Sequence, residues 1–169
     1  MYVPIILGTA REGRRSEKVA DFMLSRAKGH GIESEVLDVR DYHIKATDNT
    51  GEIPPAKRLA EKVARADALI IVSPEYNHSF PGELKMMLDM LFDEYAGKMV
   101  GICGVSNGPF GGARGMEQLK LVLVNFRMRI MSTVLYFSSV QEIFDEKGEP
   151  KDKEAWERRT EKFFDELKG

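Results

Sequence analysis

The sequence predicts an α/β protein in which a parallel β-sheet is covered by helices on both faces. Short, nearly continuous apolar runs alternate along the chain with segments whose apolar residues recur at helical spacing. Strands that are apolar on both sides are typical of parallel sheets buried between two helix layers. Five such β–α repeats fill the 169 residues without a linker or an internal repeat, so we expect a single domain over residues 1–169.

The first half of the chain supplies three strands and two helices. Apolar runs with Val and Ile predict strands at residues 3–8, 34–39 and 68–73. A helix is predicted over residues 16–27, where apolar side chains recur at helical spacing (Val19, Ala20, Phe22, Met23 and Ala27). The pair Pro54-Pro55 opens the second helix, since proline is favoured in the first helical turn.

The second half continues the same alternation. Strands are predicted at residues 98–105 and 131–137, and helices at residues 82–95, 113–127 and 153–167. The last helix carries Trp156, Phe163, Phe164 and Leu167. Turn-forming and charged residues predict irregular structure at residues 41–53 and 141–152.

Composition excludes several classes of protein. With 43% apolar and 31% charged residues, the chain is expected to be globular and not disordered. A net charge of −2 argues against general nucleic-acid binding, which needs a broad basic surface. We see no signal peptide and no apolar run of membrane-spanning length. The single cysteine, Cys103, lies in an apolar run, which predicts a buried inert thiol and fits the cytoplasm.

The loop after the first strand has the character of an anion site. Residues 8–16 combine small residues and hydroxyls with Arg11, Arg14 and Arg15, and they lead into a helix N-terminus. Free backbone N–H groups and the helix dipole favour an anion there. Thr9 and Ser16 can each donate a hydrogen bond, although Ser16 could instead cap the helix.

Two common phosphate loops are excluded by the residues of this segment. Gly8 and Gly13 have the spacing of a Walker A motif, but Arg14-Arg15 stand where Lys and Ser or Thr are needed. A G-x-G-x-x-G pattern is absent after the first strand. The loop therefore suits a terminal phosphate better than a pyrophosphate.

Two further unusual loops follow the third and fourth strands. Residues 74–85 offer an aromatic face, an amide and turn residues, which suit a flat ring with polar edges. Residues 104–114 contain glycines that allow close approach to a ligand, although a flexible surface loop is an alternative. If the strand order is 2-1-3-4-5, all three loops meet in one cleft at the switch point of the sheet.

These three loops together resemble the NADPH-dependent FMN reductase family. The resemblance rests on Gly8-Thr9-x-Arg11 with Ser16, on Pro74-Glu75-Tyr76-Asn77-x-Ser79-x-Pro81-Gly82-x-Leu84-Lys85, and on Gly111-Gly112-Ala113-Arg114. It covers nearly the whole chain and implies a flavodoxin-like, doubly wound five-stranded sheet of order 2-1-3-4-5. Members of the family include quinone, azo-dye and chromate reductases.

The resemblance also implies roles for individual residues. Thr9, Arg11 and Ser16 would hold the FMN phosphate, with Arg14 or Lys18 assisting. The isoalloxazine would be lined by Pro74, Glu75, Tyr76 and Asn77 and, on its pyrimidine side, by Ser106, Asn107, Gly108 and Gly111. Lys18 stands where many relatives carry Asn, and Met86-Met87 replace the usual Asn-Ala.

The implied activity is ping-pong hydride transfer from NADPH or NADH to N5 of FMN, and on to a quinone, azo compound, free flavin or metal oxyanion. Because the flavin carries the chemistry, we expect no catalytic protein residue and no metal. His78 has a suitable pKa range for proton delivery, but a histidine at the rim of the cleft is the alternative.

Two helices have more apolar surface than one contact with a sheet requires. They are those predicted at residues 82–95 and 113–127, and the excess predicts a homodimer or homotetramer. Deeper burial within the chain is the alternative. The family resemblance implies the same oligomers.

Two other classes of protein are alternatives to a reductase. A flavodoxin-type electron carrier would bind FMN without oxidising nicotinamide nucleotides, but it would need a strongly acidic docking face. A signalling receiver domain would need acidic residues where Gly8-Thr9 and Ser73-Pro74 stand. The sequence does not favour either class.

Overall fold

The fold is a parallel β-sheet between two layers of helices, as a computed structural model that describes residues 1–47 and 50–169 shows. Within these residues the sheet has five strands in the order β2-β1-β3-β4-β5, and every pairing is parallel. The strands are β1 (Ile5–Leu7), β2 (Val36–Asp38), β3 (Ala68–Pro74), β4 (Met99–Val105) and β5 (Arg129–Phe137). This confirms the predicted fold class and strand order.

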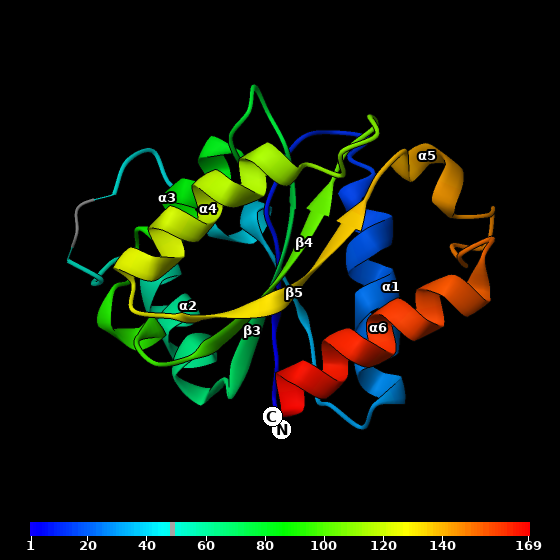
Figure 1. Ribbon diagram of the computed structural model, residues 1–169. Helices are drawn as coiled ribbons and strands as arrows, with labels where there is room; N and C mark the ends of the chain where they lie inside the picture. The colour runs from blue at the N-terminus through cyan, green and yellow to red at the C-terminus, as the bar shows by residue number, and fades with distance from the viewer. Residues whose placement is uncertain (48–49) are drawn as a thin grey trace.

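Helices cover both faces of the sheet (Figure 1). One layer contains α1 (Ser16–Gly29) and α6 (Lys153–Lys168), and the other contains α2 (Pro54–Arg65), α3 (Gly82–Leu88) and α4 (Ala113–Asn125). Alternate residues of β3 serve the two layers, since Ile70 and Val72 pack with α1 and α6 while Leu69 and Ile71 pack with the other layer. Cys103 is fully buried, as predicted, and burial raises the pKa of its thiol.

The prediction of a helix over residues 82–95 was wrong for the second half of this segment. α3 ends at Leu88, and the next turns tighten because Met90 and Leu91 donate to carbonyls three residues back. A short 3₁₀ helix, η2 (Asp93–Tyr95), follows. The departure from the α-helix brings Tyr95 into the core, where its ring lies 5.1 Å from that of Phe126. A straight helix buries only one stripe of side chains, so tertiary packing outweighs the local periodicity here.

Short elements interrupt the two segments predicted to be irregular. A 3₁₀ helix, η1 (Val39–Tyr42), overlaps the start of residues 41–53, of which residues 48 and 49 lie outside the described structure. In the segment 141–152, the first three residues belong to α5 (Val140–Ile143), so the prediction was wrong there. The remainder forms a turn closed by a bridge between Phe144 and Pro150.

The strand order decides where the unusual loops meet. β1, β3 and β4 are neighbours, so their carboxyl ends lie side by side at one edge of the sheet. The loops that follow these strands gather at this edge, at the top of Figure 1. None of the described helices is long and apolar enough to span a bilayer.

Candidate functional site

A cavity of about 400 Å³ lies among the three loops. Nine of the residues proposed for the site line it, namely Thr9, Arg11, Arg14, Ser16, Pro74, Glu75, Tyr76, Ser106 and Asn107. Four proposed residues do not line it: Lys18, Asn77, Gly108 and Gly111. The remaining wall comes from residues that were not proposed as site residues (Glu12, Gly13, Arg15, Val105 and Val140).

One end of the cavity meets the N-terminus of α1. No side chain caps this helix, so Ser16 does not act as the cap that the sequence left open as an alternative. Ser16 is buried, and its Oγ has no hydrogen-bond partner among the described residues. Because a buried polar group without a partner is costly, the hydroxyl and the free helix end together fit an oxyanion.

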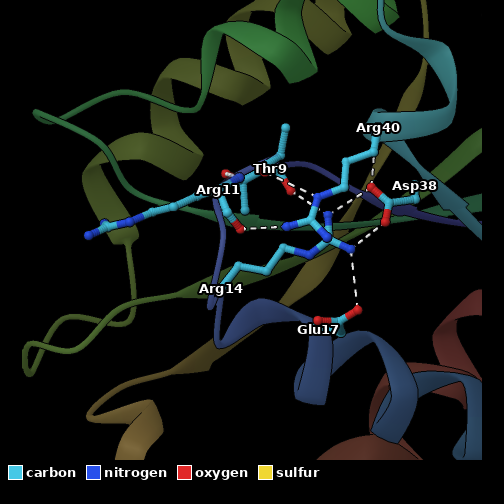
Figure 2. Close-up of polar contacts among 7 residues, drawn as sticks. Thr9, Arg11, Arg14, Glu17, Asp38 and Arg40 are labelled. Carbon is cyan, nitrogen blue, oxygen red and sulfur yellow. Dashed lines mark hydrogen bonds and ion pairs between the residues drawn. The ribbon is translucent and has the colours of Figure 1, made fainter.

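Arg14 is held by an acid from the neighbouring strand (Figure 2). Both of its terminal nitrogens contact the Asp38 carboxylate, with Nη1 2.7 Å from Oδ1, and Nη1 also donates to the carbonyl of Thr9 at 2.6 Å. The terminal nitrogens of Arg14 are therefore already used. Its buried Nε has no partner among the described residues, so Nε is the atom of Arg14 that remains for a ligand.

Arg40 ties the same loop from its outer side. Its Nε and Nη2 donate to the carbonyls of Ala10 and Arg11 at 3.1 and 2.8 Å, and its backbone N–H donates to Asp38. Burial alone would raise the pKa of Asp38, but hydrogen bonds from Arg14 and Arg40 outweigh it and lower that pKa. Arg14 and Arg40 therefore donate to the carbonyls of three consecutive loop residues, on the side of the loop that faces Asp38 (Figure 2).

Asp38 and Arg40 were missed by sequence reasoning. Asp38 ends β2, which pairs directly with β1, so the predicted strand order already placed an acid beside the arginine-rich loop. The Arg11 side chain, in contrast, is exposed at the cavity and points away from Asp38 in Figure 2.

The loops after β1 and β3 are joined by their hydroxyls. Thr9 is fully buried, and its Oγ1 lies 2.8 Å from the phenolic oxygen of Tyr76. The Tyr76 backbone in turn pairs with Ser79 through two hydrogen bonds of 2.8 and 2.9 Å. Between them, Asn77 and His78 both have positive φ, at 51° and 65°, which closes a tight turn.

This turn explains why Asn77 and His78 lie outside the cavity lining. Both side chains are exposed at the tip of the turn. The ring of His78 lies 3.3 Å from the Nη1 of Arg114, whose guanidinium sits 5.2 Å from the centroid of the Phe110 ring. His78 therefore lies outside the cavity lining, in contact with Arg114.

Glu75 connects the β3 loop to α4. Its Oε2 accepts a hydrogen bond of 3.1 Å from the N–H of Gly115, in the first turn of that helix. A carboxylate is favourable at a helix N-terminus. A side chain at Gly115 would lie only 2.6 Å from the Ser79 carbonyl, so a glycine lets the helix approach the β3 loop closely.

The loop after β4 closes the third side. Asn107 accepts a hydrogen bond of 2.7 Å from the Nη1 of Arg15, which joins this loop to the first one. The Oγ of Ser106 donates a hydrogen bond of 2.9 Å to the carbonyl of Gly108. Gly111 has a positive φ of 60° and packs against Tyr136, so its role is to shape the loop.

Lys18 lies at a different cavity. It is exposed in the first turn of α1 and lines a second cavity beside α6. Within the described residues, no group of three or more His, Cys, Asp or Glu is placed to hold a metal ion.

Comparison with known sequences identifies a family. Residues 1–142 match the model of the family described as NADPH-dependent FMN reductase. A quinone reductase of Pseudomonas putida is 30% identical over 159 residues, which cover 89% of this chain and 85% of that protein. An FMN-dependent NADPH-azoreductase of Staphylococcus aureus is 34% identical over 112 residues, or 62% of this chain and 60% of that protein.

Solved structures agree on the fold. The flavoenzyme NAD(P)H:(acceptor) oxidoreductase FerB of Paracoccus denitrificans superposes with a TM-score of 0.83 at 23% identity, over 99% of this chain and 95% of that one. A flavodoxin mutant from Pseudomonas aeruginosa superposes with a TM-score of 0.65 at 19% identity, over the full length of both chains. These likenesses show a flavodoxin-like fold.

Proposed function

The chain belongs to the NADPH-dependent FMN reductase family, and we propose that it passes electrons from NAD(P)H to a small acceptor in two half-reactions. The family and the relatives named above identify it as an NAD(P)H-dependent FMN oxidoreductase, with FMN as cofactor and NADPH as co-substrate. When bound, FMN would take a hydride at N5 and release the electrons to the acceptor in a second, ping-pong step.

The phosphate of FMN would lie at the N-terminus of α1. The observation that carries this assignment is the pair of shielded polar atoms, Ser16 Oγ and Arg14 Nε, at the cavity wall without partners in the described structure. Arg11, whose guanidinium has no ion-pair partner among the described residues, adds a cation at the same cavity. The hydrogen bonds to Asp38 fix the position of the Arg14 side chain. The direction of its Nε is therefore set before a ligand binds.

The ring of FMN would lie between the β3 and β4 loops. Pro74, Glu75 and Tyr76 supply one wall, and Ser106 and Asn107 supply the facing one. The Thr9 and Glu75 side chains act by fixing the loops, since both are hydrogen-bonded to neighbouring elements. We therefore assign no protein acid or base: Glu75 is used by α4, and His78 does not line the cavity.

The acceptor would be a small molecule that stacks in the same open cleft. The relatives named above are a quinone reductase and an azoreductase, which favours quinones and azo compounds over free flavins and metal oxyanions. We place the reaction in the cytoplasm, since one buried cysteine forms no disulfide framework within the chain and so fits a reducing compartment.

A homodimer or homotetramer through α4 is part of the proposal. Leu121 and Val124 are 67% and 62% exposed on this helix, although apolar side chains of this size usually seek burial. For the segment predicted as a helix at residues 82–95, the alternative of burial within the chain holds better, since Met90 is buried and Met86 half-buried. Replacing both Leu121 and Val124 by Glu should give a monomer in light scattering, and an unchanged mass would contradict this interface.

The enzymatic proposal is tested by anaerobic spectroscopy of the FMN-loaded protein. Adding NADPH, and separately NADH, should bleach the visible flavin absorbance, and a quinone or an azo dye added afterwards should restore it. If neither nucleotide bleaches the flavin while FMN remains bound, the protein is an electron carrier of the flavodoxin type and not a reductase.

A further inference from the structure

A second cavity, of about 280 Å³, lies on the outer side of α1. It is enclosed by α1, by the start of α6 and by the turn before α6, and Figure 1 shows this turn at the end of the α1–α6 layer. We propose that this cavity is a binding site for a small aromatic anion, such as an aromatic carboxylate. The proposal does not depend on where FMN binds, because Lys18 and the flavin-site residues line different cavities.

The floor of the second cavity is aromatic. Phe22 of α1 and Trp156 of α6 both line it, with ring centroids 6.2 Å apart and planes at 82°. Trp156 is further braced by Phe137, whose ring stacks on it at 4.3 Å. Two rings fixed at right angles form a rigid corner that complements a planar apolar ligand, because aromatic pairs favour edge-to-face and offset contacts.

Unused hydrogen-bond donors face the same cavity wall. The indole N–H of Trp156 has no hydrogen-bond partner among the described residues, and it is not fully shielded from solvent, so a ligand in the cavity can reach it. The Nε of Arg26 is shielded from solvent and is also without a partner in the described structure. Buried donors usually find an acceptor, so the Nε of Arg26, together with the accessible indole N–H of Trp156, indicates an oxygen-bearing ligand.

The charge around the cavity favours an anion. Four cations line it (Lys18, Arg26, Lys147 and Lys153), against three carboxylates (Asp21, Glu149 and Glu157). Within the described residues, none of these seven groups takes part in an ion pair within 4.0 Å. Burial, together with the nearby Glu17, raises the pKa of Asp21 and so disfavours its negative charge.

Lys153 adds a specific reason to expect an anion. It is the first residue of α6, where the helix dipole is positive and a cation is unfavourable. A bound carboxylate would compensate both the charge of Lys153 and the positive end of the helix dipole. Local rules of this kind are most often broken at functional sites.

The test uses the only tryptophan of the chain as its reporter. FMN-loaded, ¹⁵N-labelled protein is titrated with benzoate, and the single indole N–H signal of Trp156 is followed by NMR. We expect a saturable shift of this signal, and a clearly weaker response to benzamide, which has the same shape without the charge. Lys153→Gln should weaken benzoate binding about tenfold, the size of one charge-assisted hydrogen bond.

Lys162→Gln is the matched control, because this exposed lysine lies on α6 but not at the cavity. It should leave benzoate binding unchanged. The proposal is overturned if benzoate does not move the indole signal at millimolar concentration, if benzamide binds equally well, or if the two lysine variants weaken binding to the same extent. A lower stability of Lys153→Gln is recognised by its backbone NMR spectrum and does not produce this pattern.

Discussion

The hydroxyl oxygens of Thr9 and Tyr76 lie 2.8 Å apart and join the loops after β1 and β3. Thr9 is fully buried, and its Oγ1 also accepts the backbone N–H of Arg11 at 3.3 Å. The loop assigned to the phosphate and the loop assigned to the ring therefore share one hydrogen-bonded contact. Loss of this contact should therefore weaken the binding of both the phosphate and the ring of the cofactor.

Tyr76→Phe should weaken FMN binding about two- to tenfold, because one hydrogen bond contributes about 0.5–1.5 kcal/mol. Flavin fluorescence quenching measures the dissociation constant. Thr9→Val should have a similar effect, and the double variant should be no worse than the poorer single one. Additive losses in this double-mutant cycle would show that the two hydroxyls act independently.

Asp38→Asn should lower the free energy of unfolding by about 3 kcal/mol, since it leaves the charge of the buried Arg14 with only the longer contact to Glu17, at 3.4 Å. Urea denaturation measures the loss. Glu52→Gln removes an ion pair with Lys57 in which both side chains are exposed, and this control should cost at most about 1 kcal/mol. Equal losses would mean that the Arg14 pair is no more than a surface contact.

Gly115→Ala should destabilise the protein by about 1–3 kcal/mol, because the new methyl group would meet the Ser79 carbonyl and the Glu75 side chain. Gly29→Ala is the matched control at the end of α1, where no atom lies within 4 Å of the added carbon. That change should be neutral or stabilising. The comparison of the two melting temperatures isolates the steric contact from the general effect of Gly→Ala.

Glu166 should make stability depend on pH in the acid range. Hydrogen bonds from Thr133 and Ser132 lower its pKa from 4.5 to about 2. Because the folded pKa lies below the unfolded one, this stabilisation is complete above pH 4.5 and is lost as the pH falls toward about 2. The melting temperatures of wild type and Glu166→Gln should therefore differ above pH 4.5 and converge near pH 2.

The control for this pH profile is Glu161→Gln on the same helix, since the Glu161 carboxylate accepts no hydrogen bond among the described residues. Its difference from wild type should change much less over the same range. A parallel pH dependence in the two variants would mean that the β5 contacts of Glu166 are not its cause.

The sequence predicted the strands and the three loops because these depend on local patterns, whereas the order of the sheet was implied by the family resemblance. Apolar runs locate strands, and short polar segments after β1, β3 and β4 locate the cleft once the strand order is known. α3 shows where local patterns fail. Its apolar residues continue at helical spacing to Phe92, yet burial of Tyr95 against Phe126 bends the chain after Leu88.

The side-chain pairings of the site were beyond the sequence for a related reason. The family resemblance implied that Arg14 or Lys18 assists in holding the phosphate, but the partner of Arg14, Asp38, lies 24 positions away on another strand. Glu75 likewise finds its partner in Gly115 of α4, 40 positions away. A local motif tells which charges gather in a loop, whereas the packing of neighbouring elements decides which of them remain free.

The assignment of the phosphate to the α1 N-terminus is the central claim, and a comparison of FMN with riboflavin tests it most directly. Riboflavin lacks the phosphate, so wild-type protein should bind FMN far more tightly. Arg11→Ala should weaken FMN binding roughly ten- to a hundredfold, the value of a charge-assisted contact of about 1.5–3 kcal/mol. The same change should leave riboflavin binding nearly unaltered, and Arg158→Ala on the exposed side of α6 should alter neither.

The decisive quantity is the ratio of the riboflavin and FMN dissociation constants, measured by fluorescence quenching for wild type and Arg11→Ala. A large ratio that falls tenfold or more in Arg11→Ala is the result that the assignment predicts. A ratio near one in the wild type, or a ratio that Arg11→Ala leaves unchanged, would place the phosphate away from this loop.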